Sequence, residues 1–294
     1  MSFLTSLVNG LSLGSIYAII ALGYTMVYGI AKMLNFAHGD FIMVGCYIIF
    51  VATSNLGLPP AAAIILAMVL CTLLGVTTER VAYRPLRNAA SPLAVLITAI
   101  GVSYFLENLA LLIFGADTKS FTSVIPWSGL SLFDGKLQIQ GITIVTIAAS
   151  LIILLFLQLF VHKTREGQAM LAVSQDRGAA MLMGIDVNKT ITLTFAIGSA
   201  LAAVAGALLA SAYPSLTPYT GAMPGIKAFV AAVLGGIGSI PGAMIGGIVL
   251  GIIEILSRTY ISSQLSDAIV FGILVIVLIV KPTGILGKKS QEKV

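Results

Sequence analysis

Charged residues are scarce in this sequence. Only 9% of the 294 residues are Asp, Glu, Lys or Arg, and 58% are hydrophobic. A water-soluble domain carries about 25% charged residues, so a soluble fold is excluded. Apolar runs of about 18 residues or more recur, and each can cross a bilayer as a helix. A transmembrane β-barrel would instead show alternating segments of about ten residues. The sequence therefore predicts an all-α fold, a polytopic transmembrane helical bundle of about eight to ten spans with broken or re-entrant segments.

Metal-ligating side chains are equally rare. The chain has two cysteines and two histidines. Cys46 and Cys71 both fall inside apolar runs and are interpreted as small packing residues. His38 and His162 are far apart and lack companions at ligand spacing. We therefore expect no metal site, and no other cofactor.

The chain also lacks a phosphate-binding motif of the form GxxxxGK[ST]. We expect it neither to bind nor to hydrolyse ATP, to be no enzyme, and to have no catalytic residues. Ionisable residues inside the apolar runs are few: Glu107 and Glu254, with Asp40, Glu79 and Lys227 near the edges. We interpret the two glutamates as interhelical hydrogen-bonding groups. A proton- or sodium-driven carrier usually has more such groups, so energy for uphill transport would enter from another subunit.

The apolar runs fill the sequence and leave no soluble domain, so residues 1–294 are predicted to form a single transmembrane domain. The predicted spans lie at about 5–31, 41–56, 61–81, 92–114, 141–162, 190–212, 226–237, 242–257 and 266–280. The spans at 226–237 and 242–257 are short and interrupted by glycine. They are either separate crossings or a re-entrant pair.

The net charge of +5 is distributed unevenly between the two sets of loops. Twelve of the 16 basic residues fall in one set: Lys32, Arg80, Arg84, Arg87, Lys163, Arg165, Arg177, Lys189, Lys281, Lys288, Lys289 and Lys293. The opposite set holds Lys119 and Lys136. The positive-inside rule places the rich set, including the loop at about 163–189, in the cytoplasm. The basic excess is thus a topology signal, and no nucleic-acid partner is expected.

Two segments combine polarity with helix-breaking residues. LNFAHGD (34–40) interrupts one apolar region, and five of the nine residues in LGGIGSIPG (234–242) are Gly or Pro. Interrupted helices in transporters often line the substrate path. We predict that the following residues lie near a translocation path or gate: Asn35, His38, Asp40, Gly235, Gly236, Gly238 and Pro241. The alternative is that both segments are structural turns.

The loop at about 163–189 mixes charge with apolar side chains. Thr164 is predicted to cap a helix that runs to about Val173, and Ser174 a second helix that runs to about residue 183. Gly184 suits the left-handed position that ends a helix, and Asp186 or Asn188 can cap the next span. The loop is therefore predicted to hold short helices with apolar patches, including Met170, Met181 and Met183. We favour a docking surface for a partner over helices that fold back on the bundle.

Several stretches together resemble one known family. They are LNFAHGDFIMVGCY (34–47), ERVAYRPLR (79–87), AVSQDRGAAMLMGID (172–186), LGGIGSIPGAMIGG (234–247) and KPTGILG (281–287). The residues of these stretches, and the order of the stretches along nearly the whole chain, are similar to those of the LivH-type permease of branched-chain amino-acid ABC importers. Permeases of ABC importers carry a cytoplasmic coupling segment E-A-A-x-x-x-G, and residues 178–184 match its spacing with Gly178 in place of Glu.

The resemblance implies a role for the cytoplasmic loop. Residues 176, 179, 180 and 183 share one helical face. We predict that Ala179, Ala180, Met183 and Gly184 form the apolar contact with an ATPase subunit. Arg165, Asp176 and Arg177 are predicted at its polar rim.

The resemblance also implies partners and a location. It implies a LivM-type second permease, two ABC ATPase subunits, an extracytoplasmic substrate-binding protein and the lipid bilayer of a bacterial inner membrane. The implied solutes are leucine, isoleucine and valine, or related small amino acids and amides. The alternatives are an ion-coupled secondary amino-acid carrier and a non-transporting membrane subunit. Sparse intramembrane charge argues against the carrier, and the broken segments argue against the non-transporting subunit.

Overall fold

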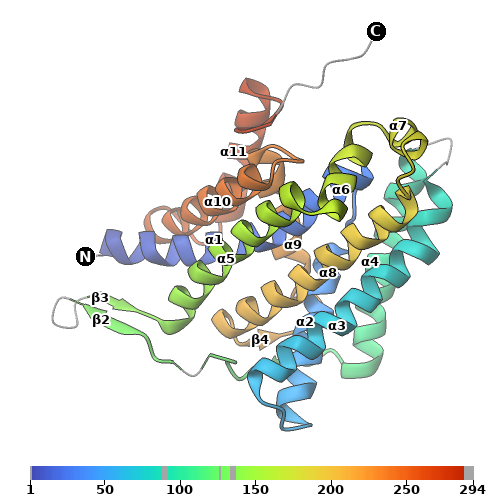
Figure 1. Cartoon of the computed structure of the whole chain (residues 1–294). Coiled ribbons are helices and arrows are strands. Elements are labelled where there is room, and N and C mark those ends of the chain that lie inside the picture. The colour runs from blue at the N-terminus through green and yellow to red at the C-terminus, as the bar shows by residue number, and fades with distance from the viewer. Residues whose placement is uncertain (1, 88–91, 126, 133–136, 288–294) are drawn as a thin grey trace. The chain divides into compact units, whose positions relative to one another are not determined.

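The computed structural model describes residues 2–87, 92–125, 127–132 and 137–287 (Figure 1). Lys136, Lys288, Lys289 and Lys293, used in the topology argument, lie outside these ranges. The apolar helices are α1 (Ser2–Ala31), α2 (His38–Ser54), α3 (Pro60–Thr78), α4 (Pro92–Phe114), α5 (Gly141–Lys163), α8 (Val187–Ala212), α9 (Ala222–Gly235), α10 (Ile240–Tyr260) and α11 (Ser266–Val280). They coincide with the spans predicted from hydropathy, which confirms the all-α polytopic fold.

The apolar helices differ in length. Within the described residues, six candidate membrane spans come from α1, α3, α4, α5, α8 and α10, which are long and apolar enough to cross a bilayer. Helices α2, α9 and α11 have 17, 14 and 15 residues. At 1.5 Å per residue, α9 extends about 21 Å, less than the hydrocarbon thickness. Helices α9 and α10 are separate helices joined by a turn at residues 236–239.

Short strands, absent from the predicted fold, occur in the connecting loops. Strand β1 (Lys119–Ser120) pairs antiparallel with β4 (Ser215–Leu216), and β2 (Leu130–Leu132) pairs antiparallel with β3 (Leu137–Ile139). Two- and three-residue strands give no period-2 signal of useful length. Hydropathy therefore could not indicate them.

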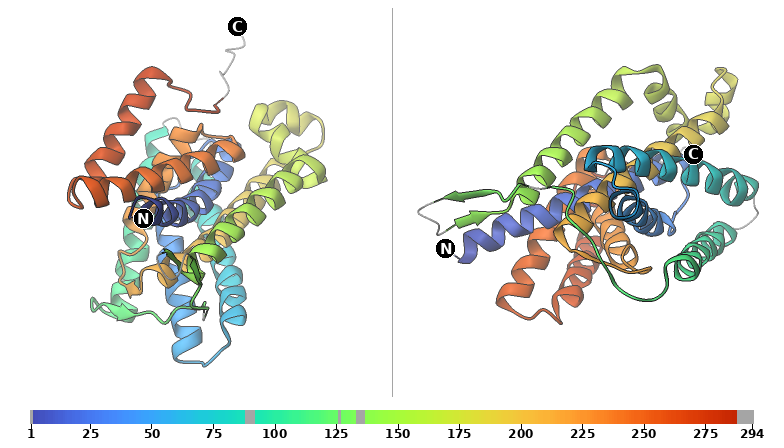
Figure 2. Two further views of the ribbon diagram at one scale, coloured as in Figure 1. Left: turned by 90° about the vertical axis from the view of Figure 1, so that its left-hand side faces the viewer. Right: turned by 90° about the horizontal axis from the view of Figure 1, so that it is seen from below.

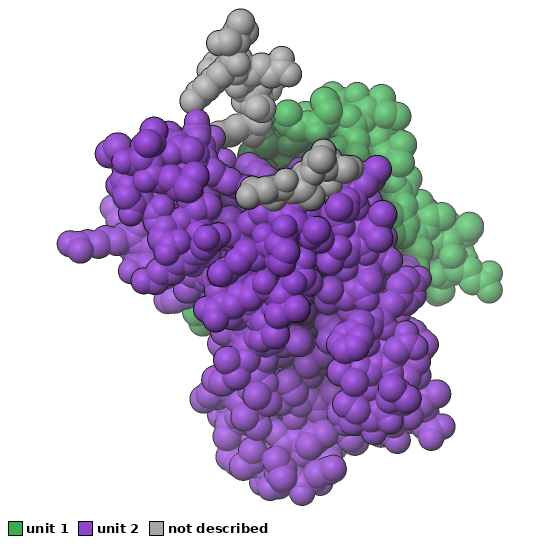
Figure 3. All heavy atoms as spheres, turned by 90° about the vertical axis from the view of Figure 1, so that its right-hand side faces the viewer, with its two compact units in different colours: residues 1–25, 127–155, 227–294 green, residues 26–126, 156–226 purple. Residues whose placement is uncertain are grey.

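The described residues belong to two compact units, which Figure 3 distinguishes by colour. Unit 1 comprises residues 1–25, 127–155 and 227–294, and unit 2 comprises residues 26–126 and 156–226. Each unit has its own packing, described in turn below.

Glycines bring α1 and α10 into backbone contact within unit 1. A Cβ added at Gly14 would lie 2.7 Å from the Cα of Ile248, and one added at Gly251 would lie 2.2 Å from the Cα of Gly14. No side chain fits at such distances. The spacing of Gly10 with Gly14, and of Gly247 with Gly251, therefore serves close helix packing.

Helices α2, α3 and α8 pack against one another in unit 2. Gly206 of α8 lies so close to α2 that a Cβ would approach the carbonyl oxygen of Ile42 to 2.8 Å. The Cys46 thiol donates a hydrogen bond to the carbonyl oxygen of Gly206 at 3.3 Å. Cys46 and Cys71 are both free and buried, as expected for packing residues.

Candidate functional site

Two short helices precede α8 in the polar loop of unit 2. They are α6 (Arg165–Gln175) and α7 (Arg177–Leu182), which lie near the first turn of α8 (Figures 1 and 2). The Thr164 hydroxyl accepts a hydrogen bond from the Gly167 amide at 3.0 Å, which confirms the predicted cap of α6. The predicted cap of the second helix is wrong. Asp176 caps α7 by accepting from the Ala179 amide at 3.0 Å, whereas the Ser174 hydroxyl donates to the carbonyl of Leu171.

The end of α7 is a Schellman turn. Gly184 has a φ of +82°, and its amide donates to the Met181 carbonyl. The amide of Ile185 donates to the Ala180 carbonyl. Asp186 then caps α8 by accepting from the Lys189 amide at 3.0 Å, which decides between the two predicted caps. These bonds fix the direction in which α7 presents its side chains.

The apolar side chains of the loop divide into a buried and an exposed group. Met170 and Val173 of α6 are buried, and α6 packs on α8, so this helix folds back on its own unit. The tip of α7 is different, because Leu182 is 90% exposed and Met183 is 82% exposed. Exposed apolar side chains at the end of a polar loop are typical of a docking surface.

The structure places the predicted contact residues in different surroundings. Ala179 and Gly184 are exposed, as is Met183, but Ala180 is only 4% exposed. The side chain of Ala180 therefore packs within unit 2 and is not available to a partner. Leu182, not predicted, occupies the most exposed position. Helical periodicity groups residues on a face without saying which face is covered.

The predicted rim residues also divide. Arg165 and Asp176 are exposed. The Arg177 guanidinium is partly covered and donates a hydrogen bond to the carbonyl oxygen of Ala31, the last residue of α1. The next residue, Lys32, has a φ of +52°, the left-handed conformation that glycine usually supplies just after a helix and that other residues rarely adopt.

The predicted path residues Asn35, His38 and Asp40 are all buried in unit 2. The Tyr83 hydroxyl donates a hydrogen bond to Asn35 Oδ1 at 2.7 Å. The centroid of the Tyr83 ring lies 5.4 Å from that of the Phe195 ring. Asn35 Nδ2 and Asp40 Oδ2 are buried and have no hydrogen-bond partner. The role of the three residues in a path stays a prediction.

Glu79 organises the turn that follows α3 in unit 2. It begins a π-helix (Glu79–Tyr83), which is followed by a 3₁₀ turn (Arg84–Leu86). The fully buried Glu79 carboxylate accepts hydrogen bonds from Arg84, Arg87 and the Thr192 hydroxyl of α8. Arg87 also donates to Asn188 Oδ1 at 2.6 Å. This cluster, which we call the Glu79 cluster, ties the turn to the first two turns of α8.

The glycine-rich segment of unit 1 forms the turn between α9 and α10. Gly236 and Gly238 have φ values of +104° and +90°, and the Ser239 hydroxyl caps α10. The amides of Ile285 and Leu286 donate to the carbonyls of Leu234 and Gly235 at 2.8 and 2.9 Å. The segment KPTGILG thus satisfies the end of α9. The predicted residues Gly235, Gly236, Gly238 and Pro241 lie in or beside this turn, and their role in a gate stays a prediction.

A second charged cluster lies in unit 1. The fully buried Glu254 carboxylate accepts from Lys227 at 2.7 Å, from Tyr17 at 2.9 Å and from Arg258. Lys227 also bonds Asp267 at 2.7 Å. We call these residues the Glu254 cluster. It confirms Glu254 as an interhelical hydrogen-bonding group, but sequence reasoning did not identify Lys227 as its partner.

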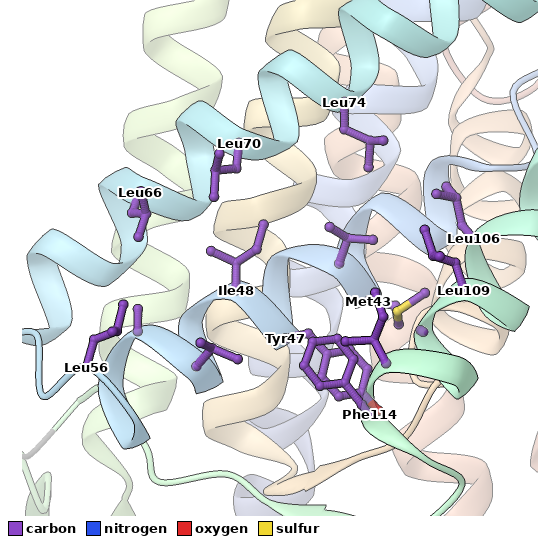
Figure 4. A pocket seen from close by; sticks show the side chains of 15 residues that line it. Met43, Tyr47, Ile48, Leu56, Leu66, Leu70, Leu74, Leu106, Leu109 and Phe114 are labelled. Atoms are coloured by element: carbon purple, nitrogen blue, oxygen red, sulfur yellow. The ribbon is translucent and has the colours of Figure 1, made fainter.

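An apolar cavity of about 430 Å³ lies between α2, α3 and α4 in unit 2 (Figure 4). Leucine, isoleucine, valine and alanine side chains dominate its lining, and the stacked rings of Tyr47 and Phe114 lie 4.1 Å apart at one side. A site for a small zwitterion needs several convergent polar groups. This cavity lacks them among the residues that line it, so it is not a candidate for such a site.

The apolar helices and the polar helical pair between α5 and α8 define a multi-pass helical membrane protein. The family model described as branched-chain amino acid transport system / permease component matches residues 6–278. The chain therefore belongs to this family of permease components.

Similar proteins cover nearly the whole chain. The high-affinity branched-chain amino acid transport system permease protein LivH of Salmonella typhimurium (strain LT2) is 45% identical, over 99% of this chain and 98% of its own. The corresponding protein BraD of Pseudomonas aeruginosa is 44% identical over the same shares. The probable branched-chain amino acid transport permease protein LivH of Methanocaldococcus jannaschii is 31% identical over 93% of this chain and 89% of its own.

Proposed function

We propose that this chain is a membrane-spanning permease subunit of an ATP-driven importer that takes up branched-chain amino acids or related small amino acids. Family membership across residues 6–278 carries the proposal, and the names of the near full-length relatives indicate the solute class. The proposed membrane is the bacterial inner membrane. The proposed partners are a LivM-type permease, two ABC ATPase subunits and an extracytoplasmic binding protein.

The proposed ATPase contact is the tip of α7. Leu182 and Met183 project from a short helix whose start and end are both capped, and Ala179 and Gly184 lie exposed beside them. A fixed apolar projection can enter a cleft with little loss of side-chain freedom. Arg165 and Asp176 are exposed and can form its polar rim.

Leu182→Glu tests the contact, because Leu182 faces solvent and its replacement leaves unit 2 intact. The carboxylate would be buried without a partner in the complex, which typically costs several kcal/mol and weakens the interface about 100-fold or more. We expect normal membrane levels of the variant. The co-purifying ATPase subunits and ATP-driven uptake should both be lost. Ala180→Glu is less informative, because Ala180 is buried within unit 2.

Leu130→Glu is the matched control, because Leu130 is an exposed leucine outside the loop. It should retain uptake and the ATPase subunits. Complete retention of both by Leu182→Glu would show that the tip of α7 is not the contact. Uptake that persists without the ATPases but stops when the proton gradient is dissipated would show an ion-coupled carrier.

A further inference from the structure

We propose that Arg177 is a positioning residue, a proposal that rests on the proposed function. Arg177 links α7 mechanically to residues 32–37, the linker between α1 and α2. In this proposal Arg177 does not contact the ATPase. It pulls on the cytoplasmic end of α1 when the ATPase moves α7.

The bond joins two ends that are far apart in the sequence. Arg177 is the first residue of α7, and Ala31 is the last residue of α1, 146 positions away. The last carbonyls of a helix have no partner within the helix and carry the negative end of its dipole. A guanidinium satisfies both requirements, because it donates a hydrogen bond and supplies a positive charge.

The other end of the linker is held by a separate bond. Asn35 is buried and accepts from the Tyr83 hydroxyl at 2.7 Å. Tyr83 belongs to the π-helix that begins at Glu79, and the Glu79 cluster fixes this segment to α8. The linker is therefore tied to α7 at Ala31 and to the turn after α3 at Asn35.

The linker itself is suited to a change of conformation. Lys32 is the only non-glycine residue with a positive φ among the described residues. Such a residue stores strain that the surrounding contacts must maintain. A buried amide nitrogen of Asn35 also has no hydrogen-bond partner. Movement of Ala31 against a fixed Asn35 would change the backbone between them, directly before the start of α2.

The test measures coupling in the assembled importer, with both permeases, both ATPases and the binding protein reconstituted in liposomes. Arg177→Ala should keep its ATPase subunits and hydrolyse ATP at a similar rate. The amount of solute transported per ATP should fall about tenfold or more, because a charge-assisted hydrogen bond is lost. Arg177→Lys, which keeps a donor and a charge, should recover part of the ratio.

Lys189→Ala is the matched control, because it removes an exposed basic side chain from the first turn of α8, directly after the loop. It should leave the transport ratio unchanged. Tyr83→Phe gives a second measurement, since it retains the ring beside Phe195 and removes only the bond to Asn35. Tyr83→Phe should also lower the amount of solute transported per ATP. If Arg177→Ala does not accumulate in the membrane, the result for Tyr83→Phe alone tests the proposal.

Loss of the ATPase subunits from Arg177→Ala would overturn the proposal, because Arg177 would then be a contact residue of the partner. An unchanged transport ratio in both Arg177→Ala and Tyr83→Phe would overturn it as well. Failure of the unaltered complex to carry out ATP-driven uptake would instead refute the proposed function. The two failures are therefore distinguishable.

Discussion

The Glu79 cluster and the Glu254 cluster both pair a buried glutamate with basic side chains, but the partners come from different parts of the chain. Each holds a fully buried glutamate with two basic side chains and one hydroxyl group. Around Glu79, the basic partners are Arg84 and Arg87, five and eight residues away in the chain. Around Glu254, Lys227 is 27 residues away and Tyr17 is 237 residues away.

The two clusters are alike in exposure. In each, one basic side chain is buried (Arg87 7%, Lys227 4%) and the other is partly exposed (Arg84 35%, Arg258 37%). They differ in the segments that they join. We infer that the Glu79 cluster shapes a turn near the membrane surface, whereas the Glu254 cluster holds α1, α9, α10 and α11 together within unit 1.

The largest effect should come from Glu254→Ala. The change leaves Lys227 buried with only the Asp267 carboxylate as an ionic partner, which should lower the free energy of unfolding by about 3–5 kcal/mol. Thermal denaturation of the purified protein in detergent measures the loss. The double variant Lys227→Met/Glu254→Met should regain most of it, because apolar side chains can replace a buried ion pair. A double variant less stable than Glu254→Ala would contradict this account.

Glu79→Ala should have a smaller effect, about 1–3 kcal/mol, because both basic partners belong to the turn that Glu79 begins, so fewer contacts between helices are lost, and Arg87 keeps Asn188. The same denaturation experiment ranks the two alanine variants. Tryptic cleavage after Arg87 should also increase, because the turn loses its anchor to α8. Equal destabilisation by the two variants would show that the separation of the partners along the chain does not matter.

The smallest effects should come from the hydroxyl groups. Tyr17→Phe removes one bond to Glu254 and should cost about 1–2 kcal/mol. Thr192→Val should cost less than Tyr17→Phe, because the Thr192 hydroxyl also lies 2.9 Å from the Asn188 carbonyl, and its bond to Glu79 competes with that bond. Both changes keep the size of the side chain. A greater loss from Thr192→Val would reverse the proposed order of the two clusters.

Hydropathy was sufficient to predict where the helices lie, but not which of their residues contact one another. Apolar runs located every long helix, and the cap residues Thr164 and Asp186 marked two helix starts. Ser174 and Asp176 are both good caps two positions apart, so local preference could not choose between them. The bond between Lys227 and Glu254 needs three-dimensional placement, since no local rule connects residues on different helices.

The candidate docking loop shows the same limit. The sequence indicated short helices with apolar side chains, and both helices are present. It could not show that Met170 and Ala180 are covered by unit 2 while Leu182 is exposed, because periodicity does not identify the covering surface. Arg177 and Ala31 are separated by 146 positions, so their bond had no signal in the sequence.

The contact between α1 and α10 restricts how this sequence can evolve. In most packed pairs, a larger residue on one side can be compensated by a smaller residue on the other. Here Gly14 and Gly251 already face each other, and neither can become smaller. A selection for second-site suppressors of Gly251→Ala should therefore yield no replacement at Gly14, only changes that shift a helix or true revertants.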